Sequence, residues 1–170
     1  MQTRAEVEPF YSATDMSEQI NLLALVRQHL LSRNEDYQWI TMGPKAEKIG
    51  LAYLPIDTLG MPATFMFTEL QEPCSLVFDV HFGSRIAPED QQELSLLLLT
   101  LNANLPEGQL LLDTEGGYVY YRLKYVLPGN TPAEEDILKQ IEHMEKVGIS
   151  MTQTYAHIIA QEFPLNPYHF

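Results

Sequence analysis

The stretch 94-LSLLLLTLNANLPEGQLLLDTEGGYVYYRLKY-125 begins with a leucine-rich segment, breaks at Asn-Ala-Asn, and then alternates between apolar and polar residues. Pro88 and Glu89 precede it, and a proline followed by an acid suits the first turn of a helix. We therefore expect a helix from this point to about Asn104, ahead of Pro106. It is not a membrane span, because crossing a bilayer takes about 20 apolar residues.

The leucine-rich helix is apolar on two opposite faces. One stripe is wide enough to cover a sheet and consists of Leu94, Leu97, Leu98, Leu101 and Leu105. The second stripe consists of Leu96, Leu99 and Ala103. Leaving two leucines in water forgoes about 1.5–3 kcal/mol each, so we expect a cover. That cover is either another helix of this chain or another subunit, which makes the second stripe a candidate dimer interface.

A hairpin and a final helix follow the leucine-rich helix. Residues 109–113 and 118–127 flank 114-TEGG-117, whose glycines permit positive φ in a turn. The sequence 131-TPAE-134 then combines a capping box with a proline at the first helical position. Apolar spacing of three and four continues through Gly148, which predicts one long helix to about Phe163. A helix end at Gly148, with a separate helix from Ser150, is the alternative.

The residues before the leucine-rich helix predict one helix and a block of strands. Asp15 or Ser17 caps a helix that runs to about Arg33. Its core-facing stripe consists of Met16, Ile20, Leu23, Val26, Leu30 and Leu31. Leu22 and Leu25 fall outside that stripe, so we expect them to contact a partner. The strands are expected at 37–42, 48–56, 63–70 and 74–82.

These elements predict an α+β fold, in which an antiparallel sheet of five to six strands packs against helices. Their order is α-β(3–4)-α-β-β-α. The chain of 170 residues is long enough for one domain with a real core. We divide it into an N-terminal arm at 1–15, a single domain at 16–163 and a C-terminal tail at 164–170.

The composition limits the classes of partner. The chain has 10 Lys and Arg against 23 Asp and Glu, a formal charge of −13, so it repels nucleic acid and anionic membranes. A charge of this size also keeps a protein in solution without any partner. Cys74 is the single cysteine, which excludes an internal disulfide. The first 15 residues contain no apolar signal-peptide segment, so we expect a cytoplasmic protein.

No motif in the sequence predicts catalysis or a cofactor. The five histidines lack zinc-ligand spacing, and neither a phosphate-binding glycine loop nor a hydrolase nucleophile motif occurs. Asp79 and His81 share a strand face and have the residue types of an acid–base pair, but such pairs usually lie on solvated sheet faces. Cys74 falls on the apolar face of its strand. We therefore predict no catalytic residue, no metal and no cofactor.

The chain resembles a known fold in its element order and acidity. The residues that carry the resemblance are 101-LNAN-104, 108-GQLLLD-113, the hairpin glycines and the acidic helix from Thr131. On these residues the chain resembles the type III secretion chaperone-like fold, and within it the YbjN-like group. The resemblance covers about residues 16–163. It implies a non-enzymatic, acidic dimer that holds a client polypeptide on apolar patches, or a regulatory relative of such chaperones.

These observations leave two candidate functions. The first is a homodimeric protein-binding module, chaperone-like or regulatory, which meets its client through the outer sheet face, including Tyr118 and Tyr120, and through Leu22 and Leu25. The second is a small-molecule-binding or enzymatic domain. Its aromatic pocket is expected between the sheet and the C-terminal helix, lined by Trp39, Tyr121 and Tyr125.

Overall fold

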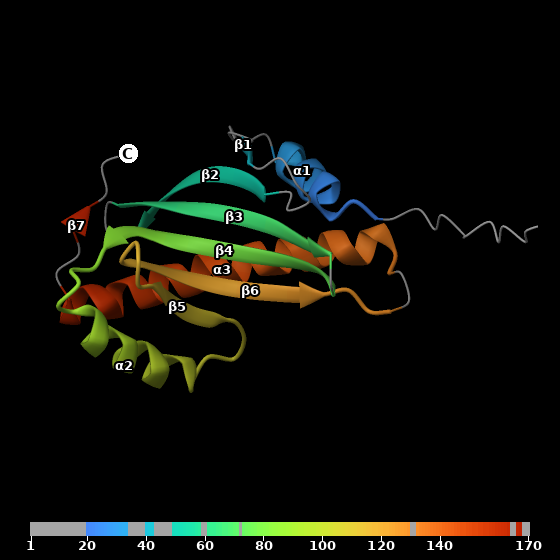
Figure 1. The fold of residues 1–170 in the computed structure, drawn as a ribbon. Helices are drawn as coiled ribbons and strands as arrows, with labels where there is room; N and C mark the ends of the chain where they lie inside the picture. The colour runs from blue at the N-terminus through green and yellow to red at the C-terminus, as the bar shows by residue number, and fades with distance from the viewer. Residues whose placement is uncertain are drawn as a thin grey trace, which may run out of the picture.

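The computed structural model describes residues 20–33, 40–42, 49–58, 61–71, 73–129, 132–163 and 166–167. The predicted N-terminal arm lies outside these residues, as does most of the predicted tail. The described elements follow in this order: α1 (Leu22–Ser32), β1 (Ile40–Met42), β2 (Ile49–Thr58), β3 (Met61–Gln71), β4 (Cys74–Arg85), α2 (Gln91–Asn102), β5 (Gln109–Asp113), β6 (Tyr118–Val126), α3 (Glu134–Glu162) and β7 (Asn166–Pro167). The prediction of an α+β fold with an antiparallel sheet and helices is confirmed (Figure 1).

The strands form one antiparallel sheet in the order β1-β2-β3-β4-β6-β5, and the two-residue β7 pairs with the end of β4. Long β4 lies at its centre, with Phe78 opposite Phe67 on β3 and opposite Leu123 on β6. Because side chains alternate along a strand, Leu76, Phe78 and Val80 point to the same face, where all three are fully buried. This face is the core face of the sheet.

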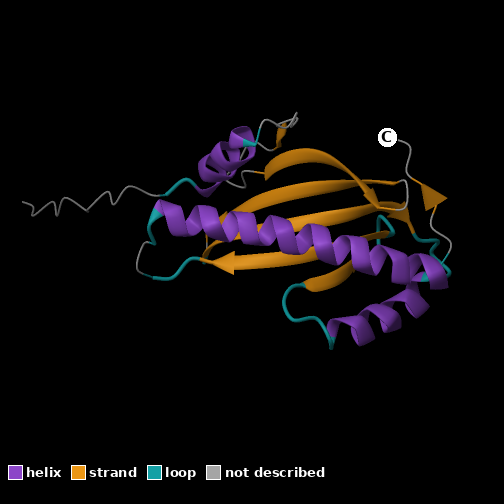
Figure 2. Cartoon of the chain, turned by 180° about the vertical axis from the view of Figure 1, so that it is seen from behind, coloured by secondary structure: helices purple, strands orange, loops and turns teal. Residues whose placement is uncertain are grey.

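Helix α3 lies along the core face of the sheet (Figure 2). It runs unbroken through Gly148, so the prediction of one long helix is confirmed and the alternative end at Gly148 is wrong. A Cβ atom at Gly148 would lie 2.4 Å from Cε1 of Phe78, which is closer than a side chain allows. Glycine at this position therefore lets α3 approach β4 closely.

Helix α2 lies beside β5, at one edge of the sheet (Figure 1). The stripe that the sequence assigned to the sheet does face the core: Leu94 and Leu98 are buried, and Leu97, Leu101 and Leu105 pack against them partly buried. Helix α2 thus has an inner face that closes this end of the core.

Helix α1 begins later than the sequence predicts. Ile20 and Asn21 are not helical, and the Asn21 side chain is the N-cap, accepting a hydrogen bond from the Ala24 N–H at 3.0 Å. The predicted caps, Asp15 and Ser17, lie outside the described residues. Because Asn21 directly precedes the apolar run, its side chain satisfies one of the free N–H groups of the first turn.

Candidate functional site

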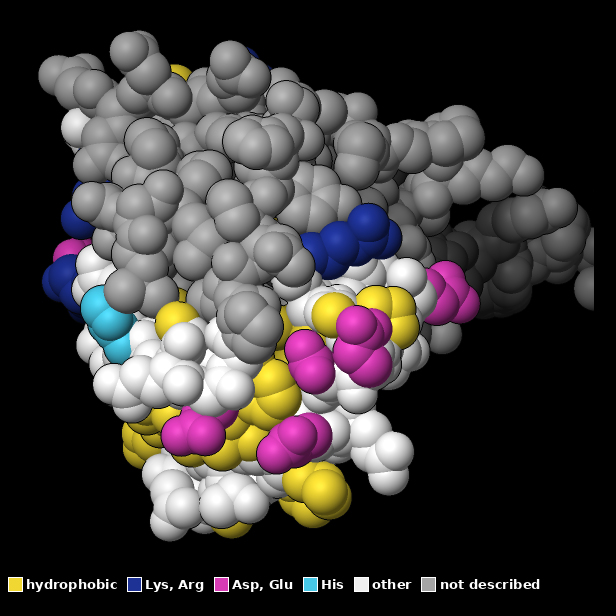
Figure 3. Space-filling model, turned by 90° about the vertical axis from the view of Figure 1, so that its left-hand side faces the viewer, with side chains coloured by type: hydrophobic (Ala, Val, Ile, Leu, Met, Phe, Trp, Pro, Cys, Tyr) yellow, Lys and Arg dark blue, Asp and Glu magenta, His cyan; other side chains and the backbone are white. Residues whose placement is uncertain are grey.

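The outer α2 face, formed by Leu96, Leu99 and Ala103, points away from the core. Leu96 is 63% exposed and Leu99 is 69% exposed, and Ala103 is also exposed. Among the residues that the structure describes, none therefore covers this face, and a cover from within the chain was one of the two that the sequence allowed. Apolar and acidic side chains lie next to one another on the lower half of the view in Figure 3.

The prediction that Leu22 and Leu25 contact a partner is wrong. Leu22 is fully buried, Leu25 is 6% exposed, and both belong to the core. The predicted stripe was set partly by Met16 and Ile20, and Ile20 precedes the helix. Counted from Leu22, the buried face runs at intervals of three and four, as an amphipathic helix requires; Leu31, placed inside the predicted stripe, is 62% exposed.

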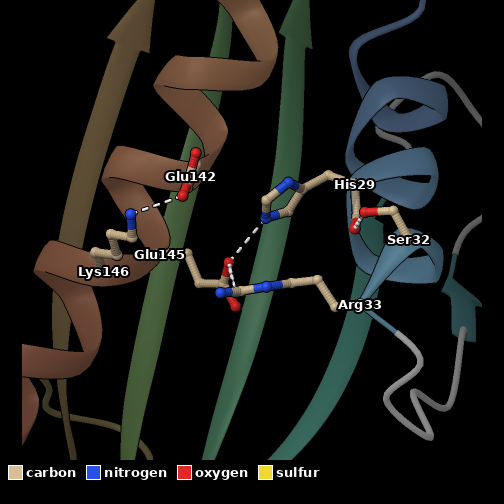
Figure 4. Close-up of polar contacts among 6 residues, drawn as sticks. All are labelled: His29, Ser32, Arg33, Glu142, Glu145 and Lys146. Atoms are coloured by element: carbon tan, nitrogen blue, oxygen red, sulfur yellow. Dashed lines mark hydrogen bonds and ion pairs between the residues drawn. The ribbon is translucent and has the colours of Figure 1, made fainter.

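A buried glutamate on α3 holds the end of α1. Figure 4 shows His29 and Arg33 reaching from the α1 side toward Glu145. Nε2 of His29 lies 2.8 Å from Oε2 of Glu145, and the Arg33 guanidinium donates to the same oxygen at 2.6 Å. Glu145 is 2% exposed, whereas the Arg33 side chain is 36% exposed. The carboxylate is thus buried, and both of these contacts come from the α1 side.

A second buried glutamate lies at the other end of α1. Glu69, on the core face of β3, is 3% exposed and accepts a hydrogen bond from the Leu23 N–H at 3.4 Å. The N-terminal end of a helix carries partial positive charge, which favours a carboxylate there. Glu69 and Glu145 therefore flank the two ends of α1.

The opposite, outer face of the sheet carries an ion pair that the sequence did not predict. Asp79 was expected on a solvated face, but its side chain is 2% exposed. It accepts two hydrogen bonds from Arg122 on β6, at 2.7 and 2.8 Å. This bidentate contact raises the pKa of Arg122. Asp79 is thus part of a charge pair that links two neighbouring strands.

Next to this pair, His81 stacks on Tyr120, with ring centroids 5.1 Å apart. Burial lowers the pKa of His81 below its ordinary value, and the nearby Asp79 carboxylate offsets only part of this lowering. Tyr118 and Tyr120, proposed to contact a client, are both half-buried. Arg122 lies over the Tyr120 ring at 5.2 Å. The result is a mixed aromatic and polar surface.

Two of the three residues proposed to line an aromatic pocket between the sheet and α3, Tyr121 and Tyr125, lie among the described residues. Tyr121 is fully buried, and its hydroxyl donates to the Glu107 carbonyl at 2.7 Å. Burial is also the main reason why the pKa of Tyr121 is raised. Tyr125 is half-buried and packs against the core, and Trp39 lies outside the described residues. Tyr121 therefore serves the core and does not line a pocket.

A surface cleft of about 510 Å³ lies elsewhere, between the loop after β4 and the turn from β5 to β6. Arg85 crosses it and donates from Nε to the Gly116 carbonyl at 2.7 Å. Glu89 and Glu115 also line it. The cleft has no buried polar group aimed into it among the residues described, so it offers no defined ligand contact.

Cys74 is half-buried, and burial followed by the Glu69 carboxylate raises the pKa of its thiol. A raised pKa disfavours the thiolate, the reactive form.

No group of three or more metal-binding side chains occurs in the described part of the chain. Within the same residues, no helix is both long enough and apolar enough to cross a membrane.

Sequence reasoning found the outer α2 face but missed Glu69, Glu145 and the pairing of Asp79. One signal was present for Glu145, because it follows Met144 within the apolar spacing of α3, where a glutamate requires a partner. That partner is more than 100 positions away in the sequence.

No known family model and no curated protein matches this chain.

Proposed function

We propose that this chain is a non-enzymatic protein-binding module, chaperone-like or regulatory, that acts as an acidic homodimer. The observation that carries the proposal is the outer α2 face, where Leu96 and Leu99 remain exposed while Leu94 and Leu98 of the same helix are buried. Among described residues, large exposed apolar side chains are few: these two, Leu31 and Val126. Two of them in adjacent turns of one helix favour a contact with another polypeptide.

The size of α2 limits what it contributes to a dimer. The helix has 12 residues and is therefore about 18 Å long. A stable interface buries about 800 Å² on each partner. The outer α2 face is thus the apolar centre of a larger contact, with polar side chains around it, as is usual for protein interfaces.

The proposal extends to fold and client. The order of α1, a strand block, α2, a hairpin and α3 supports a relationship to the type III secretion chaperone-like fold and its YbjN-like group. Tyr118 and Tyr120 remain candidates for client contact on the outer sheet face, where no described helix lies (Figure 1). Leu22 and Leu25 are withdrawn from that surface because they are buried.

Solution mass measured by light scattering or sedimentation tests the dimer. We expect the natural chain to be a dimer and both Leu96→Asp and Leu99→Asp to be monomers, because a carboxylate cannot enter an apolar contact unpaired. Leu31→Asp is the matched control, since Leu31 is 62% exposed on a different helix. A natural chain that stays monomeric at high concentration, unaffected by Leu99→Asp, removes the dimer from the proposal.

A further inference from the structure

We propose that the surface covered by α1 is a docking site for a basic amphipathic helix of a partner protein, and that α1 fills this site until the partner displaces it. We call this surface the α1 groove; it consists of the parts of α3 and β3 that α1 covers, with Glu69 and Glu145 at its two ends. The inference rests on the proposed protein-binding function and adds the chemical class of the partner.

The charge of α1 is opposite to that of the chain. The segment 22-LLALVRQHLLSR-33 contains Arg27, His29 and Arg33 and no acid, whereas the whole chain has a formal charge of −13. Its apolar face includes Leu22, Leu25, Val26 and Leu30, all buried. The occupant seen in the groove is therefore itself a basic amphipathic helix, which shows the chemistry that this surface accepts.

The groove recognises a pattern more than one particular sequence. Glu145 contacts two side chains four residues apart, the imidazole of His29 and the guanidinium of Arg33, and this spacing places them on one face of any helix. Glu69 contacts a backbone N–H in the first turn of α1, a group that every helix N-terminus offers. A partner helix with apolar residues at i, i+3, i+4 and i+8 and cations at i+7 and i+11 meets the same contacts.

Glu145 also makes the groove selective. A buried carboxylate without a partner is strongly unfavourable, so the groove disfavours a helix that lacks cations there. Helix α1 has only 11 residues, and isolated helices shorter than about 12–15 residues are marginal in water. Helix α1 therefore depends on the groove for its stability, while a longer partner helix brings more of its own.

A labelled peptide of residues 20–34, titrated against the full-length chain by fluorescence anisotropy, tests the proposal. In the natural chain, α1 competes at the roughly millimolar effective concentration of a tethered segment. Replacing His29→Ala and Arg33→Ala in the chain, but not in the peptide, weakens this competitor. We expect the peptide to bind this variant at least about tenfold more tightly, a difference of about 1.4 kcal/mol. Arg27→Ala is the control, because Arg27 is exposed on the same helix.

Adding Glu145→Gln to the same variant is expected to remove the tighter binding of the peptide. A peptide that itself carries His29→Ala and Arg33→Ala is also expected to bind the variant without this gain in affinity. Equal binding to the natural chain and the variant, or binding indifferent to Glu145→Gln, overturns the proposal. If a variant fails to fold, hydrogen exchange decides on the natural chain. Saturating peptide must accelerate exchange of the amides of residues 22–32, and unchanged exchange there overturns the proposal too.

A second copy of this chain is the competing occupant. Exchange of α1 between two copies would give the His29→Ala, Arg33→Ala variant a larger mass than the natural chain in the absence of peptide, and that result overturns the partner helix. The titration is repeated on Leu99→Asp, whose altered residue lies on α2, far from Glu145 in the sequence. Peptide binding there, with no effect of Leu99→Asp on mass, refutes the proposed dimer and retains the α1 groove.

Discussion

At the residue scale, Gly108 shows how one position closes the end of the core. It has a φ of 71°, and a Cβ atom there would lie 2.3 Å from the Tyr121 hydroxyl. The Tyr121 hydroxyl donates a hydrogen bond to the carbonyl of Glu107, the residue that precedes Gly108. Glycine is therefore required twice, once for its backbone conformation and once for the approach of a buried tyrosine.

Gly108→Ala is expected to lower the free energy of unfolding by at least about 1–2 kcal/mol, the usual cost of the left-handed conformation for a residue with a Cβ. Gly129→Ala is the matched control, because nothing lies within 4 Å of a Cβ added there. Urea unfolding followed by circular dichroism measures both. Equal stability of the two variants would contradict the role given to Gly108.

His81 predicts a pH dependence of stability. Its pKa is lowered from 6.5 in the folded chain, so the unfolded chain binds this proton more readily. Stability from this group is therefore present above about pH 6.5 and is lost as pH falls through the lowered pKa. His81→Gln, which cannot take up a proton, is expected to show a smaller loss between about pH 7.5 and 5.5 in urea unfolding. An identical loss in both chains would assign the effect to other groups.

At the element scale, Asn102 joins the end of α2 to strand β5. Its side-chain amide donates to the Leu110 carbonyl at 2.9 Å and accepts from the Leu110 N–H at 2.7 Å. Strand β5 is an edge of the sheet, and the free backbone groups of an edge strand invite pairing with another chain. One amide side chain thus occupies both groups of Leu110, as a neighbouring strand would.

Asn102→Ala is expected to cost about 1–3 kcal/mol of unfolding free energy, because it leaves partly buried backbone groups unpaired. It is also expected to promote aggregation through β5, which light scattering detects. The control is Asn104→Ala, since Asn104 makes an exposed hydrogen bond to the Thr100 carbonyl within the same helical end. Similar behaviour of both variants would show that the edge of β5 is protected by something else.

The elements also show where sequence patterns are sufficient. The long helix through Gly148 and the inner stripe of α2 were predicted correctly, because both depend on a local period that one helix face imposes. The start of α1 and the burial of Leu22 and Leu25 were predicted wrongly. The predicted buried face of α1 was placed partly by Ile20, which is not helical. Including a non-helical residue in the helical wheel turned the predicted face away from Leu22 and Leu25.

At the scale of the whole molecule, the formal charge of −13 opposes self-association and favours basic partners. Salt therefore separates the two proposed contacts. Raising NaCl from about 0.05 M to about 0.5 M shortens the screening length from roughly 14 Å to roughly 4 Å. The dimer is expected to tighten, because like charges are screened, and the labelled α1 peptide is expected to bind more weakly. The measurements are sedimentation and anisotropy, and a shift of both in the same direction would contradict this assignment of charges.

The sequence by itself determined the α+β class, the long C-terminal helix, the two faces of the leucine-rich helix and the acidic character. These follow from period, capping residues and composition, which are local or additive properties. Only the tertiary structure decided that Glu145 pairs with His29 and Arg33, that Asp79 pairs with Arg122, and that Asn102 binds the free backbone groups of Leu110 on β5. The physical reason is that a buried polar group requires a partner, and its identity depends on which distant segments the fold brings within hydrogen-bonding distance.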